Sequence, residues 1–168
     1  VHRRFDVLAD LRRNMYAGFR ARSGGTPTLE DAITAITVPF LERAMCGGQA
    51  WQCYTSLLAR LMYVGHSESS RAVAELTDPV AQEFLGWMKD AAPTASPAEI
   101  GYAYQFIIGC LMDCCSQMES DRFRRLTDGA SRLANYEDPL QRFLTFVTAG
   151  ARALIEKHGV AKRAPTAG

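Results

Sequence analysis

The sequence predicts an all-α protein, a bundle of about six to seven helices, and three observations support this fold class. Apolar residues recur at steps of three and four along most of the chain, which is the spacing that places them on one face of a helix. Several of these runs begin at a residue that can cap a helix, and glycine or proline separates them. Strand-like alternation of useful length is absent from the sequence.

Three helices are expected in the first part of the chain. The first covers about 1–22, and its apolar stripe consists of Phe5, Leu8, Leu11, Met15 and Phe19. A glycine-rich break follows. Thr28 is placed to cap the second helix, with Asp31 three residues later, and Gly47-Gly48 ends it. The third helix is expected over about 49–64.

Three later helices are expected to begin with a capping residue followed by proline, at a position where the missing N–H of proline does no harm. These starts are Asp78-Pro79, Ser96-Pro97 and Asp138-Pro139. The helices that follow them are expected over about 79–91, 97–118 and 138–157. Glu99 is placed to complete a capping box with Ser96. A shorter helix is expected near 121–133, and the domain covers 1–160, with a flexible tail over 161–168.

Length and composition indicate one globular domain. The chain has 168 residues, of which 48% are hydrophobic and 22% charged. Its 19 Lys and Arg against 18 Asp and Glu give a net charge of +1, whereas a nucleic-acid surface is normally strongly basic. No apolar run is long enough to predict a membrane span. The five cysteines, without an export signal, lead us to expect reduced thiols and a cytoplasmic location.

Two of the expected helices are too apolar to be covered easily by one short chain. The helix over 97–118 is apolar nearly all round, and the helix over 138–157 carries a second strip of small residues. The economical arrangement is a homodimer in which these helices from two subunits form a four-helix bundle. The residues expected at this interface are Ile107, Leu111, Phe146, Ala149, Gly150 and Ala153. The alternative is that both are central helices of a monomer.

No motif of a nucleotide-binding, hydrolytic or metalloprotease site is present, so we predict neither an enzyme nor a cofactor. Cys110 and Cys114 share a helical face, which is a possible half-site for a soft metal. No second pair of ligands is near them, so we interpret both as small buried hydrophobic residues and predict no metal. An enzyme acting through Asp113 and these cysteines is one alternative.

Bulky apolar side chains on the inward helix faces are numerous enough to enclose a cavity for a ligand. The residues expected to line it are Phe5, Phe40, Tyr54, Met62, Phe84, Trp87, Met88, Phe106, Cys110 and Asp113. Asp113 needs a partner, water or a cavity because an unpaired buried carboxylate is costly. Its alternatives are an exit to solvent or an ion pair with Arg142 or Arg152 across the dimer. The arginine clusters, Arg12-Arg13 among them, are interpreted as solvated faces.

Several segments share their order and spacing with a known family. They are Thr26-Pro27-Thr28-Leu29-Glu30-Asp31, Val38-Pro39-Phe40-Leu41, Tyr54-Thr55-Ser56-Leu57-Leu58-Ala59-Arg60-Leu61, Asp78-Pro79-Val80 with Phe84-Leu85, and Ser96-Pro97-Ala98-Glu99 with Phe106-Ile107-Ile108-Gly109. Over about 1–158 the chain resembles the C-terminal domain of TetR-type (tetracycline-repressor-like) transcriptional regulators. The resemblance implies a homodimer built on 97–118 and 138–157, and a small, largely apolar effector bound within each subunit. It implies no catalytic residues.

The resemblance also implies a DNA-binding domain that precedes this chain. In that family a helix-turn-helix domain comes first, and 1–22 resembles the helix that joins the two domains. The sequence starts at Val1 inside a helical pattern, as expected for a fragment of that kind. Operator DNA would be bound only through the preceding domain, and effector binding would move the first helix. The alternative function is a stand-alone helical binding or scaffold protein without a DNA-binding head.

Overall fold

The structure, a computed structural model, confirms the all-α prediction. It describes residues 2–63, 68–116, 122–130 and 137–161, and this part of the chain contains helices and no strand. The helices are α1 (His2–Ser23), α2 (Leu29–Cys46), α3 (Gln49–Tyr63), α4 (Glu68–Ala91), α5 (Pro97–Ser116), α6 (Arg122–Leu126) and α7 (Glu137–Ala161). Of the expected tail, residues 162–168 lie outside the described part.

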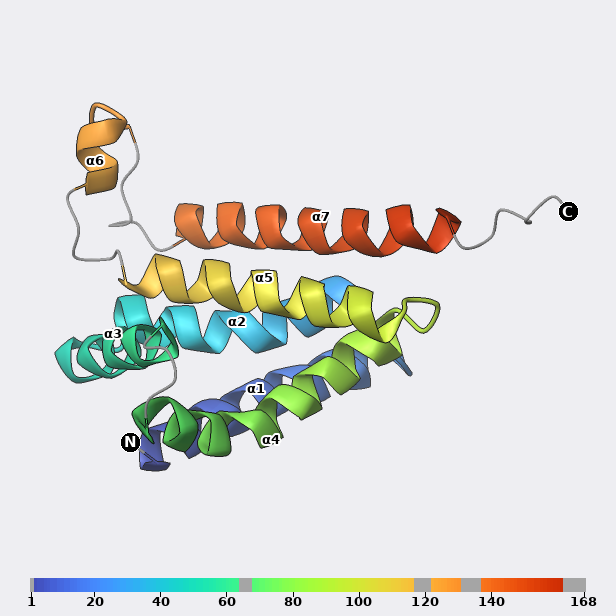
Figure 1. Cartoon of the computed structure of the whole chain (residues 1–168), viewed down its shortest axis with the longest axis horizontal. Coiled ribbons are helices and arrows are strands. Elements are labelled where there is room, and N and C mark those ends of the chain that lie inside the picture. The colour runs from blue at the N-terminus through green and yellow to red at the C-terminus, as the bar shows by residue number, and fades with distance from the viewer. Residues whose placement is uncertain (1, 64–67, 117–121, 131–136, 162–168) are drawn as a thin grey trace, which may run out of the picture.

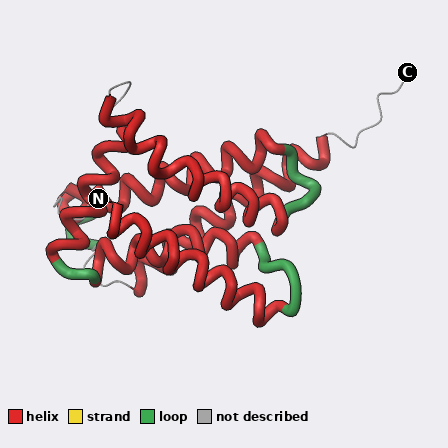
Figure 2. The backbone as a smooth tube through the Cα atoms, turned by 90° about the horizontal axis from the view of Figure 1, so that it is seen from below, coloured by secondary structure: helices red, strands yellow, loops and turns green. Residues whose placement is uncertain are grey.

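The helices are stacked in layers (Figure 1). α7 packs on α5, α2 and α3 occupy the middle, and α1 and α4 lie on the side opposite to α7. Figure 2 shows the same stack turned by 90°, with helices joined by short loops wherever the chain is described. One face of α5 therefore looks into the bundle, while its outer face and α7 border the exterior.

α2 is the central helix, because it packs against α1, α3, α4, α5 and α7. Its buried residues lie on every side: Ala32, Ile33, Ala35, Ile36, Thr37, Val38, Pro39, Phe40, Leu41 and Ala44. A helix that is apolar all round is typical of such a position. The one buried hydroxyl in this set is satisfied within the helix, since Thr37 Oγ1 donates to the carbonyl of Ile33 at 2.8 Å.

The helix caps predicted at Thr28 and Ser96 are confirmed. Asp31 N donates to Thr28 Oγ1 at 3.1 Å, and Thr28 N donates to Asp31 Oδ2 at 2.9 Å. Ser96 N donates to Glu99 Oε2 at 2.6 Å, and Glu99 N donates to Ser96 Oγ at 3.3 Å. Each capping box satisfies backbone donors that would have no partner at the first turn, and so fixes where α2 and α5 begin.

The predicted start of the fourth helix at Asp78-Pro79 is wrong. α4 begins at Glu68 and runs through Pro79 to Ala91. The turns before the proline contribute Val73 and Leu76 to the edge of the core, and this packing favours continuing the helix despite the missing N–H. α7 likewise continues past Gly159 to Ala161, and the short helix α6 ends at Leu126 instead of near 133.

Candidate functional site

A cavity of about 420 Å³ lies between helices α1 to α5, and all five contribute to its wall. It opens to solvent beside the exposed side chains of Met62, Asp78 and Gln105. Its lining residues are Phe5 and Arg12 from α1, Phe40 from α2, Leu58 and Met62 from α3, Thr77, Asp78, Val80, Ala81, Phe84 and Leu85 from α4, and Gly101, Tyr104, Gln105, Ile108 and Met112 from α5. The volume falls within the range typical of small-molecule pockets, and most of the lining side chains are apolar.

Helical spacing explains why these residues meet at the cavity. Phe5 and Arg12 are seven residues apart, which is two turns of α1, so they share one face. On α4 the same face carries Val80 and Phe84 at a spacing of four residues. A matching stripe on α5 consists of Gly101, Tyr104, Gln105, Ile108 and Met112. Each helix thus presents one stripe to the same hollow.

Arg12 is the exception among these mostly apolar side chains, because it is a buried cation with only 6% of its surface exposed. Its Nε donates to the carbonyl of Ile36 at 2.8 Å. The guanidinium carbon lies 5.5 Å from the ring centre of Phe40 and 5.1 Å from that of Phe84. Burial lowers the pKa of Arg12 to about 10, so the group still carries its charge at neutral pH.

The prediction that Arg12-Arg13 forms a solvated face is therefore wrong for one of the two residues. Arg13 is exposed and pairs with Glu83, at 3.0 Å from Nη2 to Oε2, and with Asp10. Arg12 points into the bundle instead, because successive residues of a helix are about 100° apart around its axis. The sequence carried a usable signal, since Arg12 is four residues from Leu8 and seven from Phe5, on the buried stripe.

Four of the ten residues predicted for a ligand pocket line this cavity: Phe5, Phe40, Met62 and Phe84. Three others, Tyr54, Trp87 and Met88, are buried in the core but do not line the cavity. Trp87 stacks on Tyr16, with ring centres 4.2 Å apart. The buried hydroxyl of Tyr54 has no hydrogen-bond partner among the described residues.

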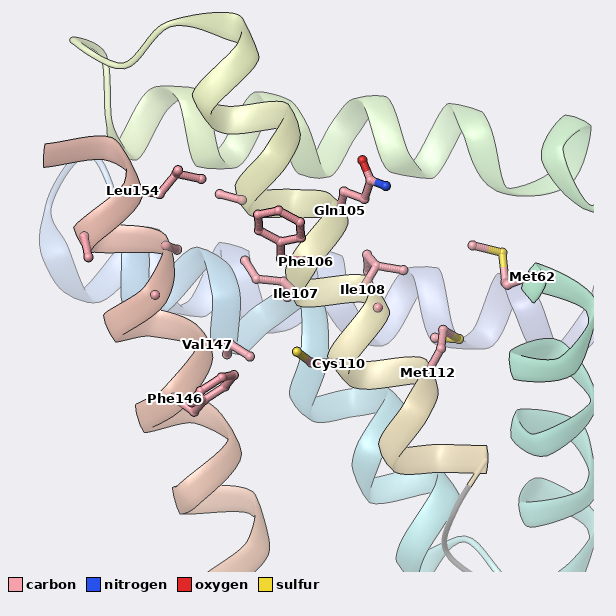
Figure 3. Close-up of a pocket in the computed structure, with 15 residues that line it drawn as sticks. Met62, Gln105, Phe106, Ile107, Ile108, Cys110, Met112, Phe146, Val147 and Leu154 are labelled. Carbon is pink, nitrogen blue, oxygen red and sulfur yellow. The ribbon is translucent and has the colours of Figure 1, made fainter. Parts of the chain in front are cut away.

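A second, larger hollow of about 970 Å³ lies along α5 and α7 (Figure 3). Phe106 and Cys110 on α5 and Phe146, Val147 and Leu154 on α7 border it. Phe106 is 59% exposed and Phe146 is 70% exposed, so this hollow is a groove on the outside of the subunit. Phe106 and Cys110 thus lie at this outer groove and not at the inner cavity for which they were predicted.

The predicted dimer-interface residues divide into two groups. Phe146, Gly150 and Ala153 line the outer groove, and Ala149 is exposed on the same helix. Ile107 also lines this groove, although only 3% of its surface is exposed, whereas Leu111 is fully buried and lines neither hollow. Leu111 belongs to the inner stripe of α5, which packs against its neighbours in the bundle. The outer stripe of α5 carries Tyr102 and Phe106 instead.

Asp113 is exposed and lines neither hollow, so its assignment to the ligand pocket was wrong. The two arginines considered as its partners pair elsewhere within the subunit. Arg142 Nε lies 2.9 Å from Asp138 Oδ2, and Arg152 Nη2 lies 3.7 Å from Glu30 Oε2. Of the three positions considered for Asp113, the structure places it at the exit to solvent.

Within the described ranges, no three His, Cys, Asp or Glu side chains are grouped so that they could hold a metal ion. Burial raises the pKa of Cys114 to about 11 and that of Cys115 to about 12, so both are neutral thiols at pH 7. None of the described helices has the length and apolarity needed to cross a membrane.

Comparison with known proteins agrees with this geometry. The family described as tetracyclin repressor-like, C-terminal domain, matches residues 34–150, from α2 to the middle of α7. The match includes α3, α4 and α5, which build most of the cavity, and the part of α7 that borders the groove. No curated protein sequence matches the chain. Because the family match covers more than half of the 168 residues, the chain belongs to the tetracyclin repressor-like C-terminal domain family.

Proposed function

We propose that this chain is the effector-binding and dimerisation domain of a TetR-like transcriptional repressor. The observation that carries the proposal is the cavity of about 420 Å³ lined by residues of α1 to α5. Its aromatic and aliphatic wall suits a small, largely apolar molecule, and its few polar groups would fix the orientation of that molecule. In such a regulator the domain binds a signal molecule and performs no catalysis.

Effector binding in the cavity would be transmitted to the DNA-binding domain by a shift of α1. Phe5 and Arg12 place this helix in direct contact with any occupant. α1 packs on α2 and contacts α4 through the Tyr16–Trp87 stack and the Arg13–Glu83 ion pair, so a displacement of α1 would be felt at those contacts. In the proposed repressor α1 follows the DNA-binding domain, and a shift of α1 would change the spacing of the two DNA-binding heads. The effector would act through its different affinities for the two head spacings.

The outer groove would form the dimer interface. Tyr102, Phe106 and Phe146 expose large apolar surfaces on neighbouring helices, and exposed apolar patches of this kind usually mark an interaction surface. Gly150 and Ala153 lie in the same groove and are small enough to let a second helix approach closely. A second copy of α5 and α7, related by a two-fold axis, would cover these residues in a four-helix bundle.

The cavity proposal is tested by filling the cavity without disturbing the fold. A Cβ atom at Gly101 would meet nothing within 4 Å, and Gly101 lines the cavity. Gly101→Met should therefore be tolerated and should occupy the ligand volume. Gly86→Met is the matched control, because Gly86 is exposed on α4, also has free space at Cβ, and does not line the cavity.

The measurement is the thermal midpoint of the chain with indole, octanol and phenylbutanol as probes. At about 100 times its dissociation constant, a bound probe should raise the midpoint by about 5–10 °C. The rise should disappear in Gly101→Met and persist in Gly86→Met. Equal shifts in the two variants would place binding outside the cavity, and no shift with any probe in the wild type would contradict an apolar effector site.

A further inference from the structure

The cavity contains a positive charge, that of Arg12, which no residue in the described part of the chain neutralises. Within the described residues, the Arg12 side chain forms one hydrogen bond, from Nε to the carbonyl of Ile36, and no ion pair. Asp78 also borders the cavity, but it is exposed and forms no ion pair with Arg12. The ionisable side chains that act most on the Arg12 charge are Tyr104, Tyr54 and Cys115.

Those three neighbours are neutral at pH 7, so they cannot serve as counter-ions. Burial raises the pKa of Tyr54 and that of Tyr104 above the usual value of 10, although the positive charge of Arg12 opposes the rise. Burial also raises the pKa of Cys115 to about 12. A buried charge without a partner is unfavourable, and the rings of Phe40 and Phe84 offset that penalty only in part.

The guanidinium of Arg12 has hydrogen-bond donors that no described residue uses. Nε is occupied by the Ile36 carbonyl, whereas no hydrogen bond to a described residue uses the two terminal nitrogens, Nη1 and Nη2. A carboxylate can accept two parallel hydrogen bonds from such a fork.

We infer that the effector is a small organic acid, with an aryl or alkyl body and a carboxylate that Arg12 binds in the cavity. The apolar body would lie against Phe40, Phe84, Ile108 and Met112. This inference rests on the proposed function and adds to it the chemical class of the ligand. It also makes Arg12 the link between ligand and signal, since the ion pair would attach the effector directly to α1.

The test compares acids with neutral molecules of the same shape. The probes are hexanoate, octanoate, 4-phenylbutanoate and indole-3-acetate, each paired with its primary amide, and the readout is the dissociation constant from titration calorimetry. At least one acid should bind the wild-type chain about tenfold or more tightly than its amide, because a charge-assisted pair replaces a neutral hydrogen bond. In Arg12→Met this ratio should fall to about one.

Arg13→Gln is the matched control, since it removes a neighbouring arginine that is exposed and does not line the cavity. It should leave the ratio of acid to amide unchanged. Arg12→Lys keeps a positive charge but removes the fork of two terminal nitrogens, so it should weaken acid binding several-fold. This variant and the wild-type comparison remain informative even if Arg12→Met does not fold.

The inference is overturned if amides bind as tightly as acids, if the preference for acids persists in Arg12→Met, or if none of the acids binds. These failures can be separated from failure of the proposed function. If the amides bind as tightly as the acids and Gly101→Met abolishes this binding, the cavity remains the effector site. Only the inference that the effector carries a carboxylate then fails. If neither series binds, both proposals fail.

Discussion

The two faces of α5 are both apolar, yet they differ in what covers them. Leu111 on the inner face is fully buried by the same chain, whereas Phe106 on the outer face is 59% exposed. The inner face also borders a cavity that contains a charged residue, and the outer face borders a groove lined almost entirely by apolar side chains. Apolar residues in a helix therefore indicate burial in general, but not whether the subunit or a partner provides it.

The first prediction sharpens this contrast through folding stability. Phe40→Ala, in the core beside the cavity, should lower the free energy of unfolding by about 3–5 kcal/mol, because Phe40 is 1% exposed and fully packed. Phe106→Ala on the outer groove should change it by less than about 1 kcal/mol. Urea unfolding measures both, in a Phe146→Glu background that removes the contribution of association. Similar losses would mean that the outer face is packed within the subunit.

The second prediction tests whether a second copy covers the outer face. Phe146→Glu should weaken self-association by about 100-fold or more, because it would bury an unpaired charge between subunits. Since Phe146 is 70% exposed in the subunit, the fold itself should tolerate the change. Sedimentation equilibrium measures the mass over a range of concentrations.

Val7→Glu is the matched control for that experiment, since Val7 is an exposed apolar residue on α1, away from the groove. It should leave the dimer intact. Gly150→Leu gives a second, steric test: a Cβ there meets nothing within the subunit but would fill the close approach between helices. A wild-type chain that is monomeric at micromolar concentration would contradict the dimer and favour a scaffold that binds a different partner.

Most of the fold could be predicted from the sequence because the signals that start a helix lie within a few neighbouring residues. The capping boxes at Thr28 and Ser96 need only residues within one turn, and both form as expected. Asp78-Pro79 misled the prediction for the same reason. Locally it is a good helix start, but the preceding turns pack on the core and continue α4 through the proline. Tertiary packing can override a local start signal, and a local sequence pattern carries no information about that packing.

The site was less predictable because helical periodicity defines stripes and not their surroundings. Phe84 and Trp87 are both inward-facing, yet Phe84 lines the cavity while Trp87 stacks on Tyr16. Arg12 was missed because arginine is expected at the surface, although its position on the buried stripe was visible. Which inward residues enclose a cavity depends on how five helices meet, and a single sequence does not specify that.

The smallest expected effect concerns the reactivity of the cysteines of α5. It distinguishes residues covered by a second copy from residues covered by the same subunit. Cys110 borders the outer groove and is partly exposed, whereas Cys115 is buried within the subunit. Alkylation by iodoacetamide, followed at each site by mass spectrometry, should therefore be several-fold slower for Cys110 in the wild-type dimer than in Phe146→Glu. Cys115 should react slowly in both, because the folded subunit shields it.

The pH dependence of this reaction supplies its internal control. Burial, followed by the charge of Asp113, raises the pKa of Cys110 above its usual value of 9. The thiolate is the reactive form, so the rate at Cys110 should keep rising above pH 9. The rate at Cys53, which is exposed, provides the reference for solvent access. Protection of Cys110 that survives in Phe146→Glu would show that the subunit itself, and not a second copy, covers the groove.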